Sequence, residues 1–125
     1  MKCVVVDTNI LMYIYLMKVD IFSELRELGF TKILIPDCVI EELEIIKDKF
    51  GGKYSKAARF ALTLIKKEKV EIVKTEKKIG TDEKLLEISI KNGCILLTND
   101  RELRKKAKNM GIEVGYIREK NRIVL

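Results

Sequence analysis

Two short apolar runs near opposite ends of the chain each lead into an aspartate, and a helical pattern follows at once. The first run covers residues 4–6 and ends at Asp7, and the second covers residues 95–97 and ends, through two polar residues, at Asp100. In a parallel sheet such a junction is the carboxyl end of a strand, where α/β proteins build their sites. We therefore expect both carboxylates at one sheet edge, where a divalent cation would hold them ionised despite their mutual repulsion.

Strand-like and helix-like segments alternate along the whole chain. Apolar runs predict strands at residues 2–6, 32–35, 70–73, 94–98, 114–117 and 123–125. Helical periodicity predicts helices near residues 9–16, 21–28, 37–50, 55–65, 81–92 and 101–110. Ser55 is the expected N-cap of the fourth helix, and Leu28, Ile90 and Met110 are expected on apolar faces. This alternation implies right-handed crossovers and a mostly parallel sheet with helices on both faces, a three-layer α/β/α sandwich.

Length and composition are those of one folded domain, which we expect to cover residues 1–125, with 47% hydrophobic and 35% charged residues. The first residues run directly into a strand, and no apolar run reaches the roughly 20 residues of a membrane span. We therefore expect a cytoplasmic protein that does not associate with a membrane. The net charge of +6 is a mild tilt toward polyanions. Abundant Lys, Glu and Ile without His, Gln or Trp is typical of a thermophile.

The chain contains no histidine. Catalysis by Ser-His-Asp or Cys-His arrangements is thereby excluded, as is any histidine-ligated metal. A bound metal would be held through oxygen, which favours Mg²⁺ or Mn²⁺ over Zn²⁺. Cys3, Cys38 and Cys94 are widely spaced within apolar stretches, and we interpret them as packed small hydrophobic residues rather than ligands or disulfides.

Two further acids fit the edge of the sheet where Asp7 and Asp100 are expected. Glu42 lies in the second turn of the helix after the strand at 32–35, and Asp82 lies at the start of the helix after a polar connection. Magnesium prefers near-octahedral oxygen ligands and keeps several waters, so one or two carboxylates per metal suffice when a phosphate completes the shell. Water polarised by such a metal can attack a phosphodiester.

Each of these acids also has a structural interpretation. Asp100 can cap the following helix, Asp82 can be a first-turn charge favoured by the helix dipole, and Glu42 can belong to a solvated face. Asp7 is harder to explain without a partner, because it ends a strand beside an apolar helix. Thr98 and Asn9 are read as turn and capping residues that also orient the acids through hydrogen bonds.

Four segments in this order and spacing resemble the PIN domain, a family of metal-dependent ribonucleases. They are Val6-Asp7-Thr8-Asn9, residues 35–43 (IPDCVIEEL), residues 81–86 (TDEKLL) and residues 97–103 (LTNDREL). The resemblance covers nearly the whole chain, and it rests on the four segments together because each alone is weak.

The resemblance implies a sheet ordered 3-2-1-4-5 and a site for Mg²⁺ or Mn²⁺ formed by the matched acids. By position these acids are Asp7, Glu42, Asp82 and Asp100, with Asn9 and Thr98 in supporting places. Glu83 replaces Asp82 if the register there slips by one residue. The implied activity is hydrolysis of RNA phosphodiester bonds by an endoribonuclease, with RNA as the partner.

Two branches of the family fit. The chain's last quarter is similar to PIN proteins of ribosomal RNA processing, which would bring a ribosome-assembly partner. VapC-type toxins share the acids and the size, and would bring an antitoxin partner. The family resemblance also implies homodimers. A non-catalytic RNA-binding or assembly factor is the alternative from another class, and a phosphoacceptor receiver domain is disfavoured because the first strand ends in a single acid.

RNA binding would require positive charge beside the acidic site. The candidates are Arg101, Arg104, Lys53 and Arg59, with Lys120 as a further basic residue. Arg101 is the preferred one because it directly follows Asp100. Tyr54 is interpreted as a packing residue, with base stacking as the less favoured reading.

Overall fold

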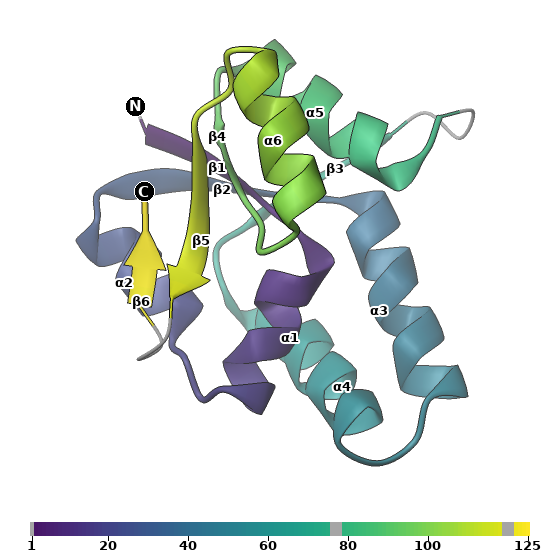
Figure 1. Cartoon of the computed structure of the whole chain (residues 1–125). Helices are drawn as coiled ribbons and strands as arrows, with labels where there is room; N and C mark the ends of the chain where they lie inside the picture. Colours follow the sequence, from purple (N-terminus) through teal and green to yellow (C-terminus); the bar gives the residue numbers. More distant parts are fainter. Residues whose placement is uncertain (1, 76–78, 119–121) are drawn as a thin grey trace.

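The computed structural model describes residues 2–75, 79–118 and 122–125, in which strands and helices alternate as the sequence predicts (Figure 1). The strands are β1 (Lys2–Val6), β2 (Phe30–Pro36), β3 (Glu71–Val73), β4 (Ile95–Leu97), β5 (Val114–Arg118) and β6 (Arg122–Val124). The helices are α1 (Thr8–Leu16), α2 (Ile21–Glu27), α3 (Asp37–Lys49), α4 (Gly52–Lys67), α5 (Thr81–Asn92) and α6 (Arg101–Asn109). Residues 76–78 of the predicted polar connection, and Lys120, lie outside the described residues.

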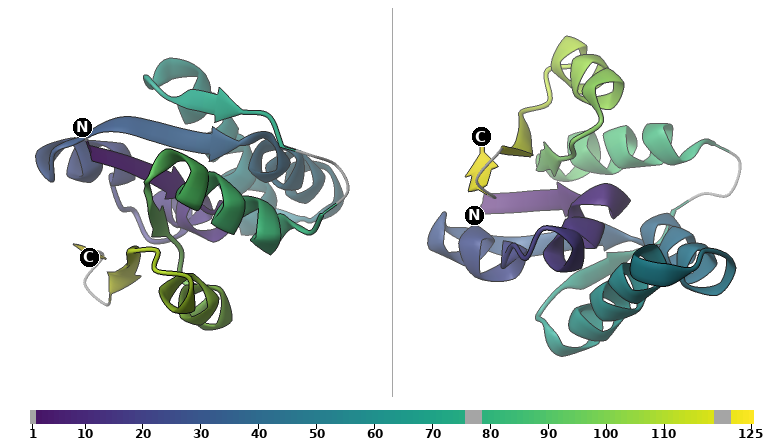
Figure 2. Two further views of the ribbon diagram at one scale, coloured as in Figure 1. Left: turned by 90° about the horizontal axis from the view of Figure 1, so that it is seen from above. Right: turned by 60° about the horizontal axis from the view of Figure 1, so that its bottom comes forward.

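The strands form one sheet in the order β3-β2-β1-β4-β5-β6. Every neighbouring pair is parallel except β5 and β6, which pair antiparallel at the edge. The predicted order 3-2-1-4-5 is thus confirmed, with the last strand added beside β5. Helices α1 to α4 cover one face of the sheet and α5 and α6 cover the other, which confirms the three-layer α/β/α sandwich (Figure 2).

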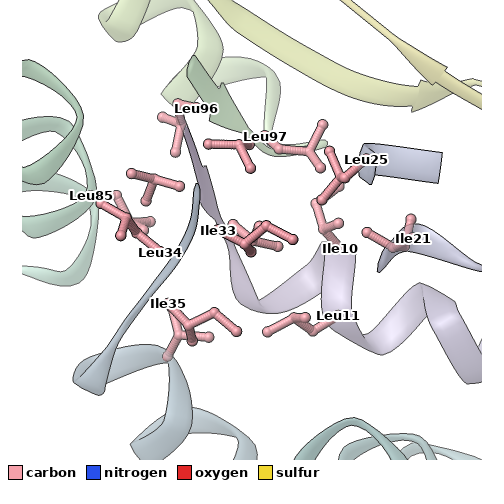
Figure 3. Close-up of a cluster of buried hydrophobic side chains, with 14 of the residues drawn as sticks. Ile10, Leu11, Ile21, Leu25, Ile33, Leu34, Ile35, Leu85, Leu96 and Leu97 are labelled. Carbon is pink, nitrogen blue, oxygen red and sulfur yellow. The ribbon is translucent and has the colours of Figure 1, made fainter. Parts of the chain in front are cut away.

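The central strands are apolar on both faces because both faces are covered by helices. Val4, Val5 and Val6 of β1 are fully buried, and so are Leu96 and Leu97 of β4. Figure 3 shows how these strands meet helices on either side, with Leu85 of α5 beside Leu34 and with Ile10, Ile21 and Leu25 from α1 and α2. Burial of this surface stabilises the fold by about 25 cal/mol per Å² of apolar area.

Four helices differ from the prediction near one end. Helix α4 begins at Gly52 with Gly51 as its N-cap, and the hydroxyl of Ser55 instead donates to the carbonyl of Lys47 at 2.8 Å. Ile90 and Met110 are each 50% exposed, and Leu28 is also exposed. These three residues lie in or just after the last turn of their helices, before the next strand begins.

Ser89 takes an inward position on α5 in place of Ile90. Its side chain is 1% exposed, and its hydroxyl donates to the Leu85 carbonyl at 2.8 Å. A buried serine is tolerated there because this hydrogen bond satisfies it within the helix.

The interpretation of all three cysteines as packed hydrophobic residues is wrong for two of them. Cys3 of β1 and Cys94, which directly precedes β4, form a disulfide with a Cα–Cα distance of 4.7 Å. The two residues are adjacent in space because β1 and β4 are parallel neighbours. Cys38 is free and buried, as predicted. In the part of the chain that the structure describes, no helix has the length and apolar character needed to cross a bilayer.

Candidate active site

A pocket of about 490 Å³ opens at the carboxyl ends of β1 and β4. All four of the predicted acids line it, although they are far apart in the sequence. The residues around the pocket are Asp7, Thr8, Asn9, Met12, Tyr13, Leu16, Glu42, Ile46, Tyr54, Thr81, Asp82 and Asp100.

The pocket lies where the chain changes direction across the sheet. Strands β1 and β4 are neighbours, but α1 leaves β1 toward one face of the sheet and α6 leaves β4 toward the other (Figure 2). Such a divergence opens a crevice at the carboxyl edge, which is where open α/β sheets bind their ligands. Asp7 is the N-cap of α1 and Asp100 is the N-cap of α6, so both carboxylates stand at this crevice.

Asp7 is held from two sides. The backbone N–H of Thr8 donates to Asp7 Oδ1 at 2.7 Å, and the hydroxyl of Thr98 donates to Asp7 Oδ2 at 2.6 Å. The backbone N–H of Asp100 in turn donates to Thr98 Oγ1 at 3.1 Å. Thr98 therefore links the two aspartates, and the Asp7 side chain, which is 8% exposed, has a fixed orientation.

Asp100 is fixed by the helix that it caps. The backbone N–H groups of Glu102 and Leu103 donate to Asp100 Oδ1 at 3.0 and 3.2 Å. Both capping bonds use Oδ1, so the cap does not engage Oδ2. The structural interpretation of Asp100 as a cap is therefore correct, and the same residue also lines the pocket.

Glu42 projects into the pocket from the second turn of α3. Its Oε1 atom is buried without a hydrogen-bond partner, and so is the hydroxyl oxygen of Thr8. A buried polar atom left unpaired costs about 1–3 kcal/mol, which makes two such atoms in one pocket unusual.

Asp82, rather than Glu83, faces the pocket from the first turn of α5. Asp82 interacts electrostatically with Asp100, and the carboxylate of Glu83 lies back against Gly80 before the helix. Asp82 therefore occupies the position that the sequence motif predicts for the acid, without the shift by one residue.

Burial, with a smaller contribution from neighbouring carboxylates, shifts three pKa values upward. Burial raises the pKa of Asp7, and Asp82 and Asp100 raise it further, while the bonds from Thr98 and Thr8 oppose the shift. Burial likewise raises the pKa of Glu42, with added repulsion from Asp7 and Asp82, while the hydroxyls of Thr8 and Thr81 oppose the shift. Burial and the charge of Asp100 raise the pKa of Asp82. Because burial and mutual repulsion disfavour the ionised carboxylates, a bound cation would stabilise them.

The donor set fits an oxygen-preferring divalent cation. The pocket offers four carboxylates and the unpaired oxygens of Glu42 and Thr8, and it contains neither cysteine nor histidine. Within residues 2–75, 79–118 and 122–125, no three Asp, Glu, His or Cys side chains are close enough together to hold a metal ion by themselves. Carboxylates spaced around a pocket suit Mg²⁺ or Mn²⁺, which retains waters and takes phosphate oxygens as further ligands.

The supporting residues join the polar network, and the basic candidates lie outside the pocket. Asn9 Oδ1 accepts from the Asn99 N–H at 3.4 Å. The Arg104 guanidinium lies 4.5 Å from the Tyr116 ring and donates to the Thr98 carbonyl at 3.2 Å. Arg101 and Arg59 are exposed on α6 and α4, and Lys53 lies beside the Tyr54 ring. Arg104 thus has a structural role that its charge alone did not reveal.

The sequence predicts Asn99 as a turn and capping residue, but it does not predict the pairing of Asn99 with β5 or the apolar wall of the pocket. The amide of Asn99 makes two bonds to Ile117 of β5, accepting from its N–H at 2.7 Å and donating to its carbonyl at 3.0 Å. The apolar wall of the pocket was also missed, because Met12, Tyr13 and Leu16 read as ordinary core residues of a short helix. The signal for this wall was their spacing after Asp7, which places them on successive turns beside the acid.

Comparison with known proteins agrees with this geometry. The sequence profile of a family described as "PIN like domain" matches residues 4–120. Ribonuclease VapC9 of Archaeoglobus fulgidus is 50% identical over 122 residues, which is 98% of this chain and 87% of that protein. The rRNA-processing protein fcf1 of Schizosaccharomyces pombe is 31% identical over 86% of this chain, which spans 54% of that protein.

A solved structure has the same fold. The PIN domain endonuclease Utp24 superposes with a TM-score of 0.76 at 28% identity, covering 97% of this chain and 90% of the other. The four acids by which the sequence resembles the PIN domain therefore lie in a fold that a solved PIN domain shares. The chain belongs to the PIN-like domain family, a family of nucleases.

Proposed function

We propose that this protein is a metal-dependent endoribonuclease that hydrolyses phosphodiester bonds in RNA. The observation that carries the proposal is the convergence of Asp7, Glu42, Asp82 and Asp100 from four separate segments onto one pocket. Three of these carboxyls have raised pKa values and one has an unpaired buried oxygen, which is the state expected of a cation site. The relatives named a ribonuclease and an endonuclease support the same activity.

The position of each residue in the pocket indicates the role that we propose for it. Asp7 and Asp100 would be the main ligands of Mg²⁺ or Mn²⁺, because the fold fixes both side chains at the crevice. A bound divalent cation would polarise a water and neutralise charge on the scissile phosphate. Glu42 and Asp82 would complete the ligand set or activate the attacking water. Thr98 and Asn9 hold the acids in position.

The setting in the cell has two candidates. A VapC-type toxin with an antitoxin partner is supported by 50% identity to VapC9 over nearly the whole chain. A role in ribosomal RNA processing is supported by the match to fcf1 and by the Utp24 fold. An antitoxin-like reading frame beside the gene would favour the toxin, and selective cleavage of a ribosomal precursor would favour processing. We propose a cytoplasmic location and a homodimer for either role.

The test compares RNA cleavage by the wild-type protein with that by Asp7→Asn. End-labelled RNA with single-stranded and structured regions is incubated with Mn²⁺, with Mg²⁺ or with a chelator. Asp20→Asn is the matched control, because Asp20 also caps a helix but lies outside the pocket. Asparagine is as good an N-cap as aspartate, so both variants should fold.

We expect metal-dependent cuts by the wild type and by Asp20→Asn, and loss of at least a hundredfold in rate for Asp7→Asn. Cleavage by Asp7→Asn at the wild-type rate would refute the site. RNA binding without any cleavage by the wild type would instead favour the non-catalytic RNA-binding factor.

A further inference from the structure

The pocket that holds the acids has a second wall of a different chemistry. Five apolar or aromatic side chains also line the pocket, which are Met12, Tyr13 and Leu16 of α1, Ile46 of α3 and Tyr54 of α4. Tyr13 lies six residues beyond Asp7, or about 9 Å along the helix axis, and Ile46 lies one helical turn beyond Glu42. The wall therefore continues directly from the acids toward the mouth of the pocket.

Tyr54 is the most exposed member of this wall. Its side chain is 47% exposed, so the ring presents a face to solvent instead of filling the core. The ammonium of Lys53 lies over one face of the ring, 5.4 Å from its centroid, so a base would stack on the other face.

We propose that this apolar wall is a base-stacking subsite, in which Tyr54 stacks on an unpaired nucleobase next to the scissile phosphate. This inference rests on the proposed function, because the carboxylates define where the phosphate lies. A phosphodiester gains nothing from an apolar surface, whereas the adjoining base has a flat apolar face that does. Lys53, at the edge of this wall, would contact a neighbouring phosphate.

The geometry specifies the substrate class. A base can reach the wall only when it is out of a duplex, so the substrate is single-stranded RNA or an unpaired loop nucleotide. Stacking tolerates all four bases, because every base has a π-face. The subsite therefore requires that a base be present at one position, without selecting its identity strongly.

The test uses an RNA series in which one nucleotide at a time is abasic. Cleavage is measured for the wild type, Tyr54→Ala and Tyr54→Phe. The control is Tyr15→Ala, because Tyr15 is also exposed but faces away from the pocket, with its ring 5.8 Å from that of Phe60. Binding of the same RNAs is measured by fluorescence anisotropy in chelator, which reads the subsite independently of cleavage.

For wild type we expect one abasic position beside the cut to lower kcat/KM about tenfold, chiefly through KM. Tyr54→Ala should lower kcat/KM for intact RNA by a similar factor and leave the abasic RNA unaffected, while Tyr54→Phe and Tyr15→Ala should behave as wild type. The anisotropy should show the same pattern in Kd.

Three results would overturn the subsite. The first is that cleavage and binding do not change when the base is missing or when Tyr54 is replaced by alanine. The second is that Tyr54→Ala loses as much on abasic RNA as on intact RNA. A loss of affinity only for a protein partner of this chain would assign the wall to that partner and also overturn the proposal. If the wild type binds RNA through Tyr54 but never cuts it, the subsite stands and the proposed nuclease activity fails.

Discussion

The hydroxyl of Thr98 donates to Asp7 Oδ2 at 2.6 Å, joining two residues that are 91 positions apart in the sequence. The same oxygen of Thr98 accepts from the backbone N–H of Asp100. One buried side chain thus sets the position of one acid and the backbone of the other. Such outer partners are often nearly as important to a cation site as the ligands themselves.

Thr98→Val should separate this positioning role from simple packing. Valine has the same shape, but it leaves Asp7 Oδ2 and the Asp100 N–H without their partner. We expect cleavage to fall by about 10–100-fold and the free energy of unfolding to fall by about 1–3 kcal/mol. Thr98→Ser should restore most of both. Thr63→Val, at an exposed site on α4, is the control for loss of a hydroxyl, and equal activity of Thr98→Val and Thr63→Val would contradict the role.

Asp7→Asn should stabilise the metal-free protein at neutral pH. Because the pKa of Asp7 is raised in the folded state, the folded protein binds more protons than the unfolded chain between the two pKa values. Stability in chelator should therefore fall as pH rises from the ordinary Asp pKa through the raised one. Asparagine carries no charge and should escape this loss.

Urea denaturation in chelator at several pH values checks this prediction. The wild type and Asp7→Asn should unfold at similar midpoints below the ordinary Asp pKa, and Asp7→Asn should unfold later at neutral pH. Adding Mn²⁺ should raise the wild-type midpoint and have little effect on the variant. A neutral-pH midpoint of Asp7→Asn well below that of wild type would show that the ionised Asp7 is net stabilising.

The Cys3–Cys94 disulfide should be detectable by alkylation. Denatured, unreduced protein should be labelled only at Cys38, and reduction should expose all three cysteines. Because the bond closes a loop across 91 positions, its removal by Cys3→Ser should lower the free energy of unfolding by about 2–4 kcal/mol. Labelling of all three cysteines without reduction would contradict the bond. Intracellular disulfides occur in hyperthermophiles, so the bond agrees with the thermophile-like composition.

Gly115→Ala should disturb the junction between β4, β5 and β6. A Cβ atom at Gly115 would lie 2.9 Å from a terminal methyl of Leu125 and 3.1 Å from the carbonyl of Val124. The leucine can move, but the backbone carbonyl must shift, so we expect a loss of about 1 kcal/mol in unfolding free energy. A thermal midpoint of Gly115→Ala equal to that of the wild type would contradict this crowding.

The sequence predicts the sheet well because its strands are buried on both faces and therefore read as continuous apolar runs. The ends of helices are predicted less well. Ser55 and Gly51 both suit the N-cap of α4, and the bond from the Ser55 hydroxyl to the Lys47 carbonyl leaves the cap to Gly51. The Cys3–Cys94 pair was missed because it depends on the adjacency of β1 and β4, which residue spacing does not show.

The site shows the same division between local and long-range information. The acids can be found from the sequence because Asp7 and Asp100 follow strands, and Glu42 and Asp82 lie in the first two turns of helices. The link from Asp7 to Thr98 and the contact of Arg104 with Tyr116 arise only from tertiary packing. Tyr54 was interpreted as a packing residue because a lone aromatic residue carries no pattern, and its place in the pocket depends on tertiary structure.

Both aspartates at the crevice do two jobs, since each caps a helix as well as lining the pocket. Asparagine caps a helix as well as aspartate does, but it brings no negative charge to the pocket. Aspartate and asparagine codons differ by a single nucleotide. A single nucleotide change at either codon would therefore give a protein that keeps the helix cap and loses one carboxylate of the pocket.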